Sequence, residues 1–237
     1  MIRLGIAGTS GGYELRPSKI IAVGLNYREH VAESPAILDR QPAKAAVPTE
    51  PILFAKTPNV LVASGEDIVI PTSFLAASGI ARPRTDYEAE LAVVIGRRCR
   101  NASPGEARSF VLGYTCFNDV SQREIQNLDR SGWFRGKSFD SFGPAGPKLL
   151  LDRDVADPQR LRIECRLNGR TVQSASTADM IFGVAELVSY ISRNMTLEEG
   201  DLIATGTPSG VGALRAGDLV EVEIEGIGVL RNRVVEE

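Results

Sequence analysis

The stretch from Arg84 to Gly96, RTDYEAELAVVIG, places two carboxylates at the start of an apolar run. Glu88 and Glu90 are two positions apart, so in a strand their side chains lie on one face. Two carboxylates on one face repel each other and are costly to bury unless a cation lies between them. Asp119, where a second apolar strand gives way to a helix, is a third carboxylate for such a cation.

The residue types limit which cation this is. The chain has one histidine, His30, so sites that need two or more imidazoles are excluded, and the three cysteines show no paired spacing. Three carboxylates suit a hard cation, and Mg²⁺ or Mn²⁺ fits best because it accepts octahedral oxygen coordination and keeps waters that a substrate can displace. The alternative is that Glu88 and Glu90 line a solvated strand face and that Asp119 caps the next helix.

The histidine lies in NYREHVAE, three positions before Glu33. On a helical turn His30 and Glu33 are neighbours, so the carboxylate can hold the imidazole in one tautomer and raise its basicity. Such a pair is a general base that can act on water. The spacing alone is not specific, and an ordinary surface or core histidine is the alternative.

A glycine-rich stretch, TGTPSGVG, runs from Thr205 to Gly212. It lacks the GxSxG pattern of a nucleophile elbow and the GK[ST] ending of a phosphate loop. A turn of this kind presents backbone N–H groups that can bind a carboxylate or a developing oxyanion. A tight loop between two strands explains the pattern equally well.

Composition indicates an ordinary globular protein. The 237 residues are 43% hydrophobic and 24% charged with a formal net charge of −3, so there is no polybasic surface and we expect no nucleic-acid partner. No apolar run approaches the roughly 20 residues that span a bilayer, and the N-terminus lacks the apolar region of a signal peptide. We therefore expect a cytoplasmic protein without a membrane partner.

Strand-type segments dominate from Ile52 onward, and Asn168-Gly169 is a hairpin turn. Helices are expected near 104–109, 120–128 and 184–193. Strands in hairpins and meanders with few long helices predict an α+β, β-rich and mostly antiparallel roll with a few peripheral helices.

Two segments between these elements are expected to be loops. Residues 34–50 are rich in proline and alanine and are the expected lid loop, and residues 129–147 have the composition of an ordered functional loop. Residues 1–18 are expected to form a short N-terminal segment, and residues 19–237 a single catalytic domain.

Five motifs in this order resemble the fumarylacetoacetate hydrolase family: NYREHVAE, DYEAELAVVIG, GYTCFNDVSQREIQ, RGKSFDSFGPAGP and ATGTPSGVG. The resemblance runs from about Ile20 to the C-terminus. It implies a mixed β-sandwich roll and a homodimer. The chain is most similar to the short branch of the family, which includes acylpyruvases, oxaloacetate decarboxylases and homoprotocatechuate-pathway isomerase/decarboxylases.

The resemblance also implies site residues. Glu88, Glu90 and Asp119 match the family's Mg²⁺ or Mn²⁺ ligands, and His30 and Glu33 match its water-activating pair, which is carried on the lid segment.

Three more positions match residues around the substrate. Lys137 matches a lysine beside the metal, Gln126 a polar substrate contact, and Thr207 the place where the glycine-rich loop approaches a substrate oxygen. A lysine there would neutralise the charge left by three carboxylates and one divalent ion. A loop lysine in solvent is its alternative.

The expected function is that of a divalent-metal-dependent hydrolase that cleaves a C–C bond in a 2,4-diketo acid resembling an acylpyruvate. The metal would stabilise an enolate, and the products would be a 2-oxo acid and a carboxylic acid. Two alternatives use the same site, decarboxylation of an oxaloacetate-type acid and isomerisation of an enol acid. An alternative of another class is an inactive paralogue that binds a metal or a 2-oxo acid.

Overall fold

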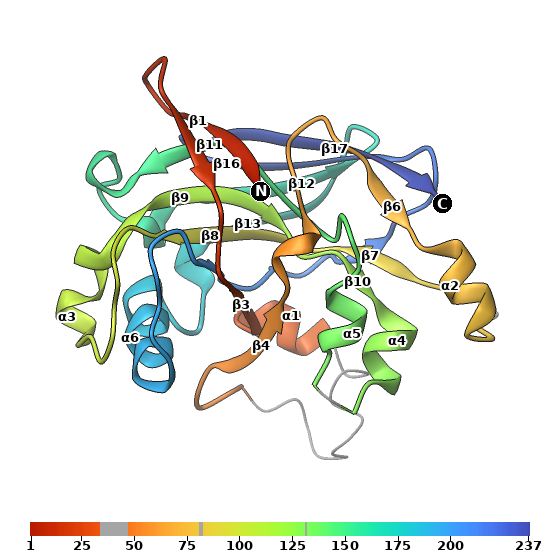
Figure 1. Ribbon diagram of the computed structural model, residues 1–237, viewed down its shortest axis with the longest axis horizontal. Coiled ribbons are helices and arrows are strands. Elements are labelled where there is room, and N and C mark those ends of the chain that lie inside the picture. The colour runs from red at the N-terminus through yellow and green to blue at the C-terminus, as the bar shows by residue number, and fades with distance from the viewer. Residues whose placement is uncertain (34–46, 81–82, 131) are drawn as a thin grey trace.

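The computed structural model describes residues 1–33, 47–80, 83–130 and 132–237 (Figure 1). Its largest sheet has the strand order β2-β1-β11-β9-β8-β14-β3-β4, with β5 paired to β11. The bounds of these strands are β1 Ile2–Ile6, β2 Gly12–Leu15, β3 Ile20–Gly24, β4 Ile52–Lys56, β5 Leu61–Val62, β8 Ala89–Ile95, β9 Val111–Asn118, β11 Gly143–Leu151 and β14 Leu202–Ala204.

Two smaller sheets complete the strand framework. A five-stranded sheet runs β13-β12-β16-β17-β6, and a three-stranded sheet runs β10-β7-β15. Their bounds are β6 Ile68–Ile70, β7 Thr85–Tyr87, β10 Ser121–Gln122, β12 Arg162–Leu167, β13 Arg170–Ser176, β15 Gly212–Ala213, β16 Leu219–Ile224 and β17 Gly228–Glu236.

Most strand pairs are antiparallel, and the parallel ones are β1 with β11, β5 with β11, β3 with β14 and β6 with β17. The expected β-rich, mostly antiparallel roll is thus confirmed. The helices lie around this framework (Figure 1). They are α1 Arg28–Glu33, α2 Thr72–Ala77, α3 Pro104–Ala107, α4 Arg123–Leu128, α5 Phe134–Lys137 and α6 Val184–Asn194.

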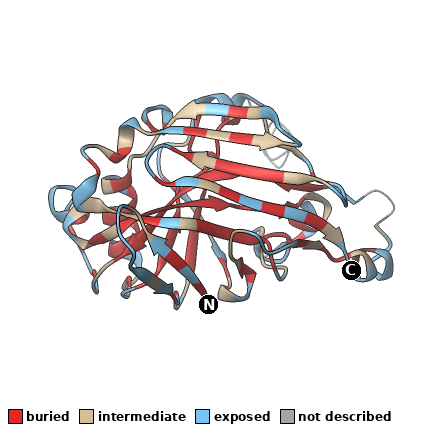
Figure 2. Cartoon of the chain, turned by 90° about the horizontal axis from the view of Figure 1, so that it is seen from above, coloured by how far each residue is buried: buried red, intermediate tan, exposed pale blue. Residues whose placement is uncertain are grey.

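The main core lies between the largest sheet and the five-stranded sheet. Leu91 and Val93 of β8 belong to the same buried apolar cluster as Val220 and Val222 of β16. Alternate residues of β8 belong to a second cluster on the opposite side, which contains Ala92. All seven residues of β8 are buried, because both faces of this central strand are covered. Figure 2 shows buried strands, in red, running through the middle of the molecule. A strand of this kind gives the charged residue on it a rigid support.

The strand expected to run unbroken through the two glutamates is divided in the structure. β7 ends at Tyr87 and β8 begins at Ala89, so Glu88 lies at the break between two sheets. The Glu88 carbonyl accepts from the Asp119 N–H at 2.9 Å, just beyond the end of β9. This contact brings the two acidic segments together at one edge of the sheet.

The ordered loop expected at 129–147 contains regular secondary structure. It contains α5 and the first residues of β11, where Gly143 and Pro144 pair with β5 and Ala145 pairs with Phe117 of β9. Of the expected lid at 34–50, residues 34–46 lie outside the described residues. Among the described residues, no helix is long and apolar enough to cross a membrane.

Candidate active site and metal centre

The three carboxylates expected to hold a metal lie together. Oxygen atoms of Glu88, Glu90 and Asp119 are all within 4.8 Å of one another. Glu88 lies at the break before β8, Glu90 lies on β8, and Asp119 directly follows β9. Their exposed fractions are 5%, 1% and 0%, which argues against a solvated strand face.

Two buried lysines neutralise part of this cluster. Lys137 Nζ, at the end of α5, donates to Glu88 Oε2 at 2.8 Å and to Asp119 Oδ2 at 2.6 Å. Lys56 Nζ, at the end of β4, donates to Asp119 Oδ1 at 2.6 Å and to the Val120 carbonyl at 3.2 Å. Asp119 therefore has a lysine Nζ at each carboxylate oxygen, and Lys137 is not a loop lysine in solvent.

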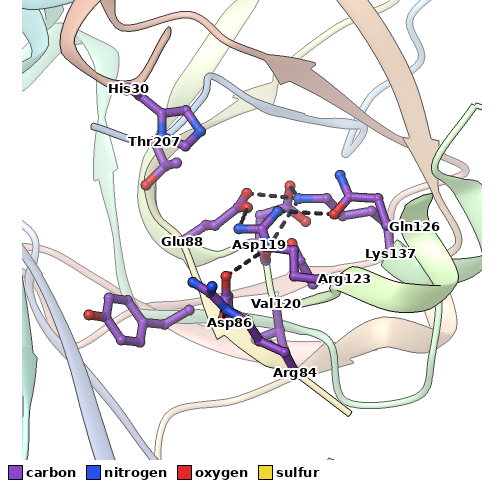
Figure 3. Close-up of polar contacts among 12 residues, drawn as sticks. His30, Arg84, Asp86, Glu88, Asp119, Val120, Arg123, Gln126, Lys137 and Thr207 are labelled. Carbon is purple, nitrogen blue, oxygen red and sulfur yellow. Dashed lines mark hydrogen bonds and ion pairs between the residues drawn. The ribbon is translucent and has the colours of Figure 1, made fainter. Parts of the chain in front are cut away.

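Arg123, in the first turn of α4, supplies a third cation. Its guanidinium contacts Glu88 Oε1 at 2.5 Å and Asp86 Oδ2 at 2.8 Å, and it donates to Gln126 Oε1 at 3.0 Å. Figure 3 shows this chain of contacts from Asp86 through Arg123 to the carboxylates and Gln126. Arg84, whose side chain is 52% exposed, holds the other oxygen of Asp86 at 2.7 Å.

These contacts determine the charge state of the cluster. Burial alone would raise the pKa of Glu88, but Lys137 and Arg123 outweigh burial and lower it, so Glu88 is a carboxylate. Burial alone would lower the pKa of Lys137, but Asp119 and Glu88 raise it, so Lys137 is an ammonium group. The pKa of Lys56 is lowered, because its burial outweighs the attraction of Asp119.

Glu90 is the exception. Among the described residues no cationic side chain pairs with it, and the Gly206 N–H donates to its Oε2 at 2.8 Å. Burial, Asp119 and Glu88 together raise the pKa of Glu90 well above its usual value. An added cation at this point would relieve the unbalanced charge, and an all-oxygen set suits Mg²⁺ or Mn²⁺. The three carboxylates thus fit a divalent ion.

His30 of α1 lies on the wall of the same pocket as Glu88 and Glu90. Its Nδ1 is 3.5 Å from Glu33 Oε2, at the outer limit of a hydrogen bond. Glu33 is held in turn by the Gly210 N–H, which donates to Oε2 at 2.9 Å. Burial lowers the pKa of His30, although Glu88 and Glu33 oppose that shift, so the imidazole is neutral near pH 7.

The two expected substrate contacts, Gln126 and Thr207, also line this pocket. Both are buried, at 2% exposed each. Thr207 lies in the glycine-rich loop that follows β14, and Figure 3 shows it beside His30 and across from Lys137. The structure therefore brings all eight residues identified from the sequence into one region.

An aromatic wall closes one side of the pocket. The Phe54 and Trp133 rings meet edge to face with centroids 5.3 Å apart, and Lys137 Nζ lies 5.0 Å from the Phe54 centroid. Gly24 permits this arrangement, because a Cβ there would lie 2.5 Å from the Trp133 ring. The wall holds Lys137 in an environment of low polarity, which strengthens its contacts with the carboxylates.

Comparison with known proteins places this geometry in a family. Residues 19–235 match the family model described as fumarylacetoacetate (FAA) hydrolase C-terminal. The chain belongs to the fumarylacetoacetate hydrolase family. The match extends over all the site residues, and the family resemblance of the five sequence motifs is confirmed.

Relatives within this family carry different reactions in their names. The bovine mitochondrial oxaloacetate tautomerase FAHD2A is 40% identical over 229 residues, which are 93% of this chain and 67% of the relative. The crystal structure of a 2-hydroxyhepta-2,4-diene-1,7-dioate isomerase from Mycobacterium marinum has a TM-score of 0.77 at 38% identity, over 93% of this chain and 75% of that one.

A third relative is a fumarylpyruvate hydrolase from Pseudomonas aeruginosa, whose structure is in complex with Mn²⁺ and pyruvate. It has a TM-score of 0.83 at 31% identity and covers 100% of this chain and 96% of its own. The expected fumarylacetoacetate hydrolase fold is thereby confirmed, and these three relatives are named as a tautomerase, an isomerase and a hydrolase.

Sequence reasoning missed several residues that shape the site. Lys56 lies at the end of an apolar strand and Gln173 in a hairpin, and neither position has a local motif. Arg123 lies in the motif that contains Asp119 and Gln126, three positions before Gln126, so helical spacing could have identified it.

Proposed function

We propose that the chain is a divalent-metal-dependent hydrolase that cleaves a C–C bond in a 2,4-diketo acid and releases a 2-oxo acid and a carboxylic acid. The observation that carries the proposal is that a neutral, carboxylate-oriented imidazole and a buried acidic cluster line one pocket. The base at His30 and the carboxylates at Glu88 and Glu90 can therefore act on the same substrate.

Glu88, Glu90 and Asp119 would hold the metal ion, for which Mg²⁺ and Mn²⁺ are the candidates. When bound, the ion would supply Lewis-acid stabilisation of negative charge on the substrate oxygens. Four buried carboxylates, the three ligands and Asp86, face the cations Lys56, Lys137 and Arg123. Because Arg84 also pairs with Asp86, a divalent ion would leave positive charge in excess, which favours an anionic substrate.

In the proposed reaction His30 removes a proton from water, which attacks the carbonyl farther from the carboxylate end of the substrate. Glu33 keeps the imidazole oriented and stabilises the imidazolium that forms. The proton on His30 is then available to the carbon atom released when the C–C bond breaks. Lys137 balances the charge of Glu88 and Asp119, and Gln126 and Thr207 contact substrate oxygens.

A second candidate is tautomerisation of oxaloacetate, with decarboxylation of the same acid as a variant. The specific observation in its favour is the 40% identity to the bovine oxaloacetate tautomerase over 93% of the chain. Enol–keto conversion needs one base and a stabilised enolate, so His30 could move a proton between oxygen and carbon without attack by water.

The test is turnover by metal-stripped protein with and without added Mg²⁺ or Mn²⁺. Pyruvate release from an acylpyruvate that returns with metal, and that disappears in the Glu88→Gln variant, is the expected result. A metal-dependent loss of the enol absorbance of oxaloacetate, without pyruvate release from any acylpyruvate, would instead support the tautomerase. Tight metal binding with no turnover of either substrate class would favour the inactive binding protein and contradict both.

A further inference from the structure

Gln173 of β13 connects the strand that carries the glutamates to the loop that carries Thr207. It is 1% exposed. Its Oε1 accepts from the Ala89 N–H at 3.0 Å, and its Nε2 donates to Thr207 Oγ1 and to the Pro208 carbonyl, each at 2.8 Å. Ala89 is the residue between Glu88 and Glu90, so this one amide side chain contacts both halves of the site.

The orientation of the Gln173 amide is fixed by its partners. The Ala89 N–H can only donate and the Pro208 carbonyl can only accept, so the amide oxygen faces Ala89 and the amide nitrogen faces Pro208. Both hydrogens of Nε2 are then committed, one to Pro208 and one to Thr207. It follows that the Thr207 hydroxyl accepts from Gln173.

A hydroxyl that accepts in this way keeps its own proton for another partner. Within the described parts of the chain the Thr207 hydroxyl donates to no neighbouring group, and Thr207 lines the pocket with His30 and the glutamates. The proton is therefore available to a ligand in the pocket. The loop cannot turn away readily, because the Gly206 N–H is bound to Glu90 and a Cβ on Gly206 would lie 2.7 Å from the Asn26 Cβ.

Gln126 also presents a hydrogen-bond donor to the pocket, and a different contact fixes its orientation. Its Oε1 accepts from Arg123 at 3.0 Å, so its NH₂ group is the part left for the pocket, and Figure 3 shows the nitrogen turned away from Arg123. Arginine has no acceptor, which excludes the flipped amide. Two neutral side chains on the pocket wall are therefore both held as hydrogen-bond donors.

We infer that Gln173 is a positioning residue that fixes the Thr207 hydroxyl as a donor, so that the pocket selects ligands whose oxygens at this place are acceptors, as in the carboxylate and carbonyl of a 2-oxo acid. This inference rests on the proposed function for the substrate class. It assigns to Gln173 a role that acts through Thr207 and not through a contact with substrate.

A double-mutant cycle on pyruvate binding tests the inference. Binding of pyruvate to Mn²⁺-loaded protein is measured by calorimetry for the wild type, Gln173→Met, Thr207→Val and the double variant, with Mn²⁺ binding measured separately. Loss of a donor to a charged oxygen is expected to weaken pyruvate binding about tenfold or more. The effect of Gln173→Met should largely disappear in the Thr207→Val background, because its route to the ligand is already gone. Thr207→Ser, which keeps the hydroxyl, is the conservative comparison and should bind pyruvate more tightly than Thr207→Val.

The separate Mn²⁺ measurement guards against simple misfolding, because each variant that keeps the fold should keep its Mn²⁺ affinity within about threefold. Equal losses of pyruvate affinity from Gln173→Met in the two Thr207 backgrounds would overturn the inference, and so would full pyruvate affinity in Gln173→Met. A wild type that binds Mn²⁺ without binding pyruvate would overturn the proposed function and the inference with it.

Discussion

The Glu90→Gln variant measures two effects of the buried Glu90 carboxylate. One is its effect on the stability of the metal-free protein, and the other is its contribution to metal binding. The amide oxygen of the glutamine can still accept from the Gly206 N–H, which donates to Glu90 at 2.8 Å, so the local geometry is kept. The raised pKa of Glu90 means that the metal-free fold binds this proton more tightly than the unfolded chain does. Stability contributed by the protonated group is present below the usual pKa of 4.5 and is lost as pH rises through the raised value.

The expected result without metal follows from that sign. The free energy of unfolding of the wild type falls, relative to that of Glu90→Gln, as pH rises above about 4.5. At neutral pH the metal-free variant should be as stable as the wild type or more stable. Exposed Glu236 is the matched control, since Glu236→Gln changes no buried charge. The free energy of unfolding of Glu236→Gln should follow that of the wild type in parallel as pH changes.

With bound metal the wild type should be more stable than Glu90→Gln. At a free Mn²⁺ concentration about 100 times its Kd, binding adds about 2.7 kcal/mol. For a chain of 237 residues this raises Tm by about 5–11 °C. Removing an ionised ligand should weaken binding about 100-fold, so at the same Mn²⁺ concentration the variant gains about 0.4 kcal/mol, or about 1–2 °C. Differential scanning fluorimetry from pH 4 to 8 measures both effects. Equal Mn²⁺ shifts in wild type and Glu90→Gln would refute the assignment of Glu90 as a ligand.

Three further outcomes are expected. His30→Ala should keep Mn²⁺ affinity but lower kcat by about 10²–10⁴-fold in steady-state assays, and unchanged kcat would remove His30 as the base. Because burial lowers the pKa of His30, the acidic limb of the kcat/KM profile should fall below the usual value of 6.5, with activity lost as pH drops through it; a limb above 6.5 would contradict a neutral buried imidazole. Lys56→Met removes one partner of a buried ion pair and should cost about 3–5 kcal/mol in urea unfolding of metal-free protein. Lys19→Met removes a half-buried lysine from its pair with Asp201 and should cost less.

Strand positions were predictable where the apolar pattern was strong. The stretches around β3, β8 and β9 are long and apolar, and the Asn168-Gly169 turn sets the β12–β13 hairpin. The break at Glu88 was not predictable, because it depends on the pairing of β7 with β10 and β15, which come from distant parts of the sequence. The same is true of α5, a single short helix in a glycine-rich segment whose place depends on its contacts with the acidic cluster.

The acidic cluster was predictable because its members come from local patterns of carboxylates beside buried strands. Its charge balance was not, since lysine and arginine are usually exposed and nothing near Lys56 in the sequence indicates a buried partner. The sequence indicated one counter-cation, Lys137, whereas the structure has three around the carboxylates. A divalent ion would therefore do more than neutralise the cluster. With Lys56, Lys137 and Arg123 already present, the added ion would create an excess positive charge where the wall also presents the donors of Gln126 and Thr207. Charge and hydrogen-bond polarity therefore favour the same proposed ligand, an anion rich in acceptor oxygens. The added ion, and not that ligand, would balance the charge of Glu90, which lacks a cationic side-chain partner among the described residues.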